Sequence, residues 1–365
     1  MKKIILEGCN TEWAQLHYLP TLLESVQEGK TELLAIGIEP EIRLGDPYIK
    51  KLWHVLAHSR SVRYINKNDR QHSDTSDITH VFVVTPDRYH SSVASYWLDH
   101  IDPRGNIFVE KPLDVSVLSA LALKEKIERE QKRNTVFAFD HYLARAWPFL
   151  RLKRECLREI GELKSIDFSI LESSSIPPHR EQSLDKGIIF DLFCHILAIV
   201  GVLVEGDSTV PKLSFQRIKL DKVKVAQYVG CPICGETFAL LDFTIGDLPV
   251  RAIMGKYVAS DTKAMNICGS RGRIQLDFLK DEFEIFDSQD NRKEYGHLNP
   301  QHVEIFIKKA IKEIDVTLSD GILSFEAAFE ILMILNQVKA QIQEMPLYQP
   351  LTPFDQIFKE LGDKS

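Results

Sequence analysis

The sequence predicts an α/β part followed by an α+β part: an N-terminal doubly wound parallel sheet, then a large, mostly antiparallel open sheet. In the first part, short β-branched runs alternate with helical segments, whereas beyond about residue 164 strand-like runs follow one another across short turns. A length of 365 residues is sufficient for two domains. We expect a first domain at residues 1–145, a second at 146–345 and a C-terminal tail at 346–365.

Strand and helix signals alternate through the first half of the chain. Strands that are joined by helices pair in parallel, because the helix returns the chain to the same edge of the sheet. Residues between 39 and 79 show no clear pattern and are expected to be irregular. The predicted strands are residues 3–6, 32–38, 80–84, 106–109 and 135–139, and the predicted helices are residues 12–27, 91–98 and 116–131.

The second half is richer in strands. The apolar run at residues 188–204 nears membrane-spanning length, but Asp191 and His195 within it favour a buried helix. The predicted strands are residues 163–171, 212–220, 222–229, 237–245, 250–256 and 273–278, and the predicted helices are residues 187–203, 301–313 and 324–343.

Composition and charge narrow the class of protein. The net charge is −7 and hydrophobic residues make up 44% of the chain, so neither nucleic acid nor a membrane is an expected partner. The first residues carry no secretory signal pattern and the six cysteines are scattered, which predicts a reduced, cytoplasmic protein. Cys231 and Cys234 form one CxxC without a second pair at zinc spacing, so no metal is expected.

The first predicted strand runs into Gly8, at the start of a turn that leads into a helix. A strand, a glycine turn and a helix N-terminus can hold a pyrophosphate through backbone N–H groups, as in a Rossmann-type domain. Asn10 can adopt the left-handed conformation that a second glycine would supply, whereas Trp13 is bulky for a close helix–strand contact. An ordinary βα turn is the alternative interpretation.

Glu39 lies at the end of the second predicted strand, where a carboxylate can bond a ribose 2′-hydroxyl and favour NAD. Nearby Arg43 would instead serve the 2′-phosphate of NADP, and a solvated turn glutamate is the third possibility. The sequence therefore leaves NAD and NADP open, with a slight preference for NAD.

Two further strand ends carry polar residues. Thr85, Pro86 and His90 follow the third predicted strand, and Glu110 and Lys111 end the fourth. Ligands bind at the carboxyl ends of parallel strands, and a lysine there can polarise a substrate oxygen or relay a proton. The alternatives are loop closure for the threonine, a helix cap for the histidine and a surface position for the lysine.

Asp191 and His195 are four residues apart, which places them on one face of the predicted helix. A carboxylate can orient an imidazole or keep it charged, and so make a general base for an alcohol hydroxyl. A simple helix pair is the alternative. It is disfavoured because the neighbouring residues are apolar and charges that serve no purpose are costly there.

Six motifs of this chain recur together in one known family. They are Val84-Thr85-Pro86 with His90, Glu110-Lys111-Pro112, Asp191 with His195, Arg145-Ala146-Trp147-Pro148, Ile160-Gly161-Glu162-Leu163 and Gly269-Ser270-Arg271-Gly272. They resemble the signature of the glucose-fructose oxidoreductase/inositol dehydrogenase superfamily, over roughly residues 3–340. That resemblance implies a coenzyme domain joined to an open-sheet domain, with Lys111, Asp191 and His195 as the catalytic group.

A second resemblance is to glucose-6-phosphate dehydrogenases. Residues 8–14, continuing to Pro20, look like their GxxGDLA…PxL coenzyme turn; residues 140–145 (DHYLAR) resemble their DHYLGK segment, and residues 187–191 the stretch before their catalytic histidine. This resemblance implies His195 as the base and Asp140 as its orienting carboxylate. The implied substrate contacts are His141, Tyr142 and Arg145, the last in place of the lysine of DHYLGK.

Together these features predict an NAD(P)-dependent dehydrogenase or reductase. It would transfer a hydride between nicotinamide and a hydroxyl or carbonyl carbon of a sugar, a sugar phosphate or a cyclitol. The expected coenzyme contacts are Gly8, Asn10, Thr11, Glu12, Trp13, Glu39, Thr85, Pro86, His90, Glu110 and Lys111.

Two expectations accompany this prediction. Thr11 replaces the middle glycine of the coenzyme turn and Glu12 its aspartate. A ligand sensor or scaffold with weakened coenzyme binding on the same fold is therefore the alternative function. An open antiparallel sheet often pairs across subunits, so we expect a homodimer or homotetramer through the second domain.

Overall fold

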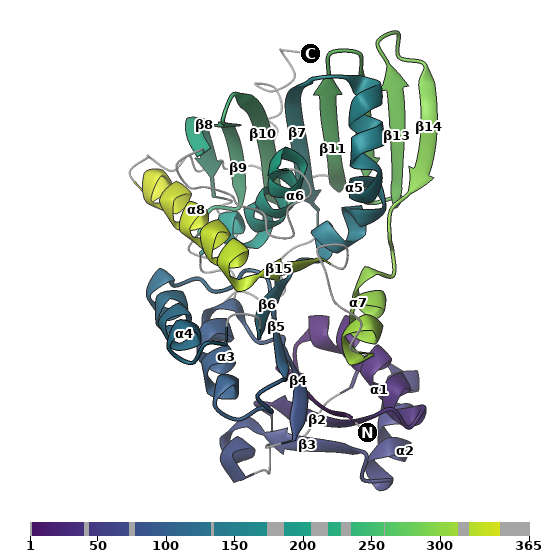
Figure 1. Ribbon diagram of the computed structural model, residues 1–365, viewed down its shortest axis with the longest axis vertical. Coiled ribbons are helices and arrows are strands. Elements are labelled where there is room, and N and C mark those ends of the chain that lie inside the picture. Colours follow the sequence, from purple (N-terminus) through teal and green to yellow (C-terminus); the bar gives the residue numbers. More distant parts are fainter. Residues whose placement is uncertain are drawn as a thin grey trace. The chain divides into compact units, whose positions relative to one another are not determined.

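The computed structural model describes residues 2–39, 44–72, 77–132, 135–173, 186–205, 218–227, 235–258, 260–312 and 321–343. The chain forms two compact units (Figure 1). The first unit combines Met1–Ala144 with Gln301–Phe329, and the second combines Arg145–Pro300 with the described part of Glu330–Ser365. Residues 301–329 thus belong with the first unit, although the sequence-based division placed them in the second domain. The predicted tail, 346–365, lies outside the described residues.

The first unit contains a seven-stranded sheet in the order β15-β6-β5-β4-β1-β2-β3. All neighbouring strands are parallel except β15, which runs antiparallel to β6. The predicted doubly wound sheet is therefore confirmed. Its strands are β1 (Lys2–Glu7), β2 (Thr31–Gly37), β3 (Val62–Asn66), β4 (Ile78–Val83), β5 (Asn106–Glu110), β6 (Val136–Phe139) and β15 (Ile322–Ser324).

Helices cover both faces of this sheet (Figure 1). On one face α3 packs on α4 and on β4 and β5, and on the other α1 packs on α2 and α7. The apolar core on the second face runs from Ile4 and Leu6 of β1 to Phe306 of α7. The helices are η1 (a π-helical turn, Ala14–Tyr18), α1 (Leu19–Gln27), α2 (Pro47–His58), η2 (Lys67–His72), η3 (Asp87–Tyr89), α3 (His90–Leu98), α4 (Val117–Arg129) and α7 (His302–Ile311).

The expectation that residues 39–79 are irregular is wrong for most of that segment. It contains α2, β3 and η2. The Asp46 carboxylate caps α2 by accepting a hydrogen bond from the backbone N–H of Ile49 (2.9 Å), and Pro47 follows at the first helical position. Asp-Pro is an ordinary helix start signal. The buried residues Ile49, Leu52 and Leu56 that follow also have helical spacing, so the segment did carry local signals for α2.

The second unit contains an eight-stranded sheet in the order β14-β13-β12-β11-β7-β10-β9-β8. Only β7 and β10 are parallel neighbours, so the prediction of a mostly antiparallel sheet is confirmed. Within the described residues, the two strands predicted at 212–220 and 222–229 meet in one strand, β8; residues 212–217 and 228–229 lie outside the described ranges. Strands β11, β13 and β14 were not predicted. The strands are β7 (Leu163–Glu172), β8 (Ile218–Ala226), β9 (Phe238–Ile245), β10 (Leu248–Lys256), β11 (Thr262–Gly269), β12 (Gly272–Asp277), β13 (Glu282–Asp287) and β14 (Arg292–His297).

Helices line one face of this second sheet. The predicted buried helix is present as a π-helical turn, η5 (Ile189–Phe193), followed by α6 (Cys194–Glu205). Two more helices, α5 (His141–Ile160) and α8 (Phe325–Gln343), span the sequence boundaries of the two units. None of the helices in the described ranges is long and apolar enough to cross a membrane.

Two motifs noted in the sequence, residues 160–163 and 269–272, join the start of β7 to the turn between β11 and β12 by backbone hydrogen bonds. The backbone N–H of Ser270 bonds the carbonyl of Glu162 (2.9 Å), and the N–H of Arg271 bonds that of Ile160 (2.7 Å). Gly161 has a φ of +81°, and a side chain there would run into the Ser270 hydroxyl. The two glycine motifs are therefore required by one tight contact in the second unit.

Candidate functional site

The turn after β1 brings the backbone of two strands into close approach. Gly8 has a φ of +90°, and a Cβ atom there would lie 2.5 Å from the carbonyl oxygen of Val84, at the end of β4. Only glycine fits this position. The turn places the start of the η1–α1 helix at the carboxyl edge of the parallel sheet, which is where such folds hold a dinucleotide.

Side chains complete this turn where further glycines are missing. The Thr11 hydroxyl bonds the carbonyls of Gly8 (3.0 Å) and Val84 (3.2 Å) and accepts from the backbone N–H of Ala14 (3.2 Å). The Asn10 side chain accepts from the N–H of Ile38 at the end of β2 (2.9 Å). The eroded glycine pattern is thus compensated by two polar side chains, and the turn keeps its place at the sheet edge.

Trp13 and Glu110 form a bond that the sequence did not indicate. The Trp13 indole Nε1 donates to Glu110 Oε1 (2.9 Å), and the Tyr18 hydroxyl donates to the same oxygen (2.6 Å). Glu110 is 6% exposed. Burial raises the pKa of this carboxyl, an effect that the bonds from Tyr18 and Trp13 partly offset. The bulky residue of the coenzyme turn therefore anchors the helix to the end of β5.

The loop after β4 offers a polar atom to a ligand. Within the described residues, the buried Thr85 hydroxyl has no hydrogen-bond partner. His90, by contrast, is fully buried, with Nε2 2.7 Å from the carbonyl of Thr85 and Nδ1 2.7 Å from that of Pro112. Its ring joins the loop after β4 to the loop after β5. Thr85 is a candidate coenzyme contact, and His90 holds the loop in place.

Lys111 follows β5 at the same edge. Its backbone N–H bonds the carbonyl of Phe139 at the end of β6 (3.2 Å), and the peptide bond to Pro112 is cis. Its side chain is half-buried. Glu39 also lies at this edge, where its carbonyl accepts from the Tyr64 hydroxyl (2.6 Å) and from Asn66 Nδ2 (3.1 Å). Five strand ends of the first sheet thus carry predicted site residues.

Asp140 is the N-cap of α5. Its Oδ1 accepts from the backbone N–H of Leu143 (2.9 Å), its own N–H bonds the carbonyl of Gly321 (2.8 Å), and it is 1% exposed. The cap fixes the two residues that follow, His141 and Tyr142, whose ring centroids lie 4.8 Å apart.

A cluster of rings surrounds His141. Its centroid lies 4.9 Å from that of Trp13 and 6.0 Å from that of His302, at the start of α7, and Trp13 in turn lies 3.9 Å from His17. His17 and His302 were not predicted as site residues. His302 gave no sequence signal, because its contact with His141 joins segments about 160 residues apart, whereas His17 lies one helical turn after Trp13.

In the second unit, His195 is 1% exposed in α6 and Asp191 lies one turn earlier in η5. Asp191 Oδ2 forms an ion pair with Lys256 Nζ (2.9 Å), at the end of β10. Arg145, a predicted substrate contact, pairs with Asp281 (Nε to Oδ1, 2.5 Å). The sequence missed both partners. Lys256 ends a predicted strand, and period-2 alternation would have placed it on the covered face of the sheet.

Another buried carboxylate lies at the end of β1. Glu7 is 4% exposed and accepts from Trp97 Nε1 (2.9 Å) and from Arg70 (3.1 Å), whose guanidinium lies 4.1 Å from the centre of the Tyr96 ring. Burial raises the pKa of Glu7, and Arg70 opposes that shift. This pair was not predicted. It holds η2 against the sheet beside the coenzyme turn.

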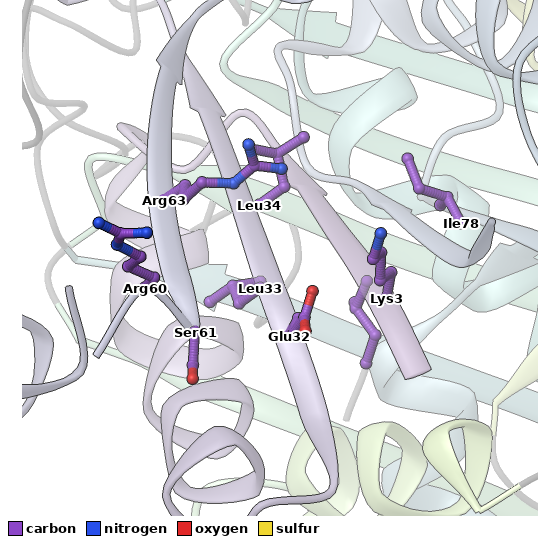
Figure 2. Close-up of a pocket in the computed structure, with 9 residues that line it drawn as sticks. Lys3, Glu32, Leu33, Leu34, Arg60, Ser61, Arg63 and Ile78 are labelled. Atoms are coloured by element: carbon purple, nitrogen blue, oxygen red, sulfur yellow. The ribbon is translucent and has the colours of Figure 1, made fainter. Parts of the chain in front are cut away.

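A shallow pocket of the first unit lies at the wrong edge for this chemistry. Figure 2 shows its lining by Lys3, Glu32, Ser61, Arg63 and Ile78. These residues lie at or near the amino ends of β1 to β4, whereas ligands of doubly wound sheets bind at the carboxyl ends. We therefore do not assign the candidate site to this pocket.

The fold defines the class: a unit with a Rossmann-type doubly wound sheet, joined to a unit with an open, mostly antiparallel sheet. Residues 56–147 match the family model of the glucose-6-phosphate dehydrogenase NAD-binding domain. This match contains the motifs at Thr85, Lys111 and Asp140 but not the turn at Gly8. No curated protein matches the chain.

Solved structures resemble the chain over nearly its whole length. They include UDP-N-acetylglucosamine 3-dehydrogenase from Acidithiobacillus ferrooxidans (15% identity, TM-score 0.64, 93% of this chain and 96% of that one). A 3-ketoreductase from Actinomadura kijaniata, with NADP and TDP-benzene, has 12% identity and a TM-score of 0.67 (93% and 97%). Levoglucosan dehydrogenase, with NADH and levoglucosan, has 15% identity and a TM-score of 0.66 (94% and 98%). The predicted resemblance is thus confirmed at the level of the fold.

Proposed function

We propose that the chain is an NAD(P)-dependent oxidoreductase that acts on a CH–OH or C=O group of a sugar, a sugar phosphate or a cyclitol. The observation that carries this proposal is the carboxyl edge of the first sheet. There a positive-φ glycine turn, the Thr85 hydroxyl and Lys111 follow three strands that are neighbours in the sheet. The sugar dehydrogenases and the ketoreductase that share the fold support the assignment of the substrate class.

The chain's own residues fit a dinucleotide at this edge. The turn at Gly8 presents a helix start to a pyrophosphate, Glu39 is placed for an adenosine ribose and Thr85 for the nicotinamide half. Asn10, Thr11, Glu12, Trp13, Pro86, His90 and Glu110 shape the same edge. Bound NAD(P) supplies the hydride acceptor or donor. A slight preference for NAD rests on Glu39, since Arg43 lies outside the described residues.

Proton transfer is assigned to His195. In the oxidation direction it takes the hydroxyl proton while the hydride leaves the carbinol carbon, and Lys111 polarises the oxygen. Asp191 or Asp140 is proposed as the carboxylate that supports His195: Asp191 lies in the same unit as His195, and Asp140 Oδ1 caps α5. His141, Tyr142 and Arg145 are the proposed substrate contacts. The scattered spacing of the six cysteines supports the proposal of a reducing, cytoplasmic location.

The decisive test combines binding with turnover. The purified protein is titrated with NADH and NADPH by nicotinamide fluorescence, then assayed with a panel of sugars, sugar phosphates and cyclitols. We expect binding of one coenzyme, and kcat lower by about 10²–10⁴-fold in Lys111→Ala and His195→Ala. Absence of binding by either coenzyme would overturn the proposal and favour the sensor or scaffold alternative.

The same preparation tests a homo-oligomer. We propose a homodimer or homotetramer that associates through the open sheet of the second unit. Light scattering coupled to size-exclusion chromatography measures the mass directly. A monomer at all concentrations would contradict this part of the proposal while leaving the enzymatic assignment intact.

A further inference from the structure

Asp191, one of the two carboxylates proposed to support His195, belongs to a row of charged side chains. Lys256 Nζ lies 2.9 Å from Asp191 Oδ2 and 2.9 Å from Glu172 Oε2. Lys263 Nζ lies 2.8 Å from the other oxygen of the same glutamate, Glu172 Oε1. The four side chains therefore alternate in sign: aspartate, lysine, glutamate, lysine.

The sheet puts these side chains in register. Strands β10, β7 and β11 are neighbours, and Lys256 pairs directly with Glu172 in the parallel ladder. Lys256 shares its face of β10 with Met254, which is fully buried, and η5 packs against this strand. The row therefore lies at one end of the face of the sheet that η5 covers, next to Asp191.

Burial makes the row sensitive to any missing member. The side chains of Lys256 and Glu172 are only 10% and 18% exposed. Burial alone would lower the pKa of Lys256, but the Asp191 and Glu172 carboxylates outweigh it and raise that pKa. Burial would likewise raise the pKa of Glu172, yet Lys256 and Lys263 lower it. Removing Lys256 would therefore take this ion pair from Asp191 and one of two ion pairs from Glu172, in a poorly solvated place.

We propose that Lys256 is a positioning residue for the reaction. Its ion pair holds the Asp191 carboxylate of η5 in place. It thereby sets the orientation of the helix start that leads to His195 and the charges around it. This inference rests on the proposed function. Asp191 retains 21% exposure of its side chain while one oxygen is held by Lys256. Lys256 is bound on one side by Glu172 from β7 and on the other by Asp191 from η5, and Lys263 from β11 is the outer cation.

Lys263 provides a matched control. It is also a lysine, it pairs with the same glutamate, and its side chain is 23% exposed, but its ion pair is with Glu172 rather than with Asp191. We therefore compare Lys256→Met with Lys263→Met, and use Lys256→Arg to restore charge with a different geometry. Circular dichroism and cooperative urea unfolding check that each variant folds. If Lys256→Met does not fold, Lys256→Arg and Glu172→Gln replace it in the same comparison.

The kinetic outcome separates positioning from general stabilisation. Lys256→Met is expected to lower kcat by about 10–100-fold, with an unchanged Kd for NADH, because coenzyme contacts lie in the first unit. Loss of the Lys256 ammonium disfavours the ionised form of the Asp191 carboxylate. In a plot of kcat against pH, the acidic limb is therefore expected to move to higher pH. Lys256→Arg should recover the position of this limb. Equal kcat values and equal acidic limbs in Lys256→Met and Lys263→Met would overturn the proposal.

A second readout needs no turnover. The Cε1–H resonance of His195, assigned by its loss in His195→Gln, is followed by NMR against pH, together with amide exchange at residues 189–195. We expect Lys256→Met to shift this titration and to speed exchange, and Lys263→Met to do neither. If the unmodified protein binds no coenzyme and turns over no substrate, the proposed function fails, and the NMR comparison alone decides the role of Lys256. Identical titrations in the two variants would refute it.

Discussion

In the described part of the chain, η1 of the first unit and η5 of the second are both π-helical turns that open a helix, but they are held differently. The turn at η1 is fixed by two neutral donors, Trp13 and Tyr18, on one oxygen of the buried Glu110. At η5, ion pairs replace neutral donors: Asp191 pairs with Lys256. Single π turns are frequent at functional sites.

The difference matches the work that we assign to each turn. A dinucleotide needs a fixed backbone shape, which two neutral donors onto one carboxylate can supply. A proton-transferring histidine needs a fixed charge environment, which ion pairs supply. We therefore infer that the contacts at η1 fix the backbone shape of that turn, whereas the contacts at η5 fix the charges around it. Substitutions at or next to the two turns test these contacts separately.

The largest effect is expected from glycines next to the two turns. At Gly8 (φ +90°), an added Cβ would lie 2.5 Å from the backbone carbonyl oxygen of Val84. At Gly187 (φ +78°), it would run into the Glu236 carboxylate. Changing either to alanine should lower the free energy of unfolding by roughly 3–5 kcal/mol, since positive φ and overpacking both cost. Urea unfolding measures this. Gly29→Ala is the control: its φ is +71° but no atom lies within 4 Å, so about 1 kcal/mol is expected.

The second prediction removes an ion pair before η5. Glu236, 1% exposed, pairs with Lys339 and accepts from the backbone N–H of Ile189 (3.2 Å). Glu236→Gln should cost about 2–3 kcal/mol, because the lysine is left without its partner charge but stays partly exposed. Arg251→Met, which removes the exposed pair with Asp242, is the control and should change stability by less than about 0.5 kcal/mol. Equal losses in the two variants would contradict the importance of buried charge at η5.

The third prediction removes one donor at η1. Tyr18→Phe eliminates the 2.6 Å bond to Glu110 and should cost about 1.5–3 kcal/mol, as expected for a bond to a charged group. Tyr48→Phe, at a side chain that is largely exposed, should be neutral within about 0.5 kcal/mol. Chemical unfolding of the two variants, side by side, measures both. A neutral Tyr18→Phe would show that Glu110 does not fix the turn.

The smallest effect is a pH dependence. The pKa of Glu110 is raised by burial, so its contribution to stability is present below its unfolded value of about 4.5 and is lost as pH rises through the folded value. Glu110→Gln keeps an acceptor oxygen but does not titrate. The unfolding free energy of the wild type, measured relative to this variant, should therefore fall as pH rises above 4.5. The comparison cancels the similar contribution of Glu7. A difference that is constant between pH 4 and 8 would contradict the burial effect.

The sequence predicted both sheet types, because period and turn spacing are local signals. It also located Lys111 and Asp140 at strand ends, and His195 in a buried helix. It did not reveal that Glu110 accepts from Trp13 or that Asp191 pairs with Lys256, because each of these bonds joins segments more than 60 residues apart. Trp13 illustrates the limit. Judged by size alone, it was an obstacle to the coenzyme turn, whereas its indole N–H makes it an anchor.

The His90 ring has a consequence for altering this protein. The two ring nitrogens lie at hydrogen-bond distance from the carbonyls of Thr85 and Pro112, so one side chain joins two loops that are separate in sequence. A designer who wished to change coenzyme preference by rebuilding the loop after β4 would therefore also displace the backbone beside Lys111. Libraries for such a purpose are best built with both loops varied together, or with residues 85, 90 and 112 kept constant.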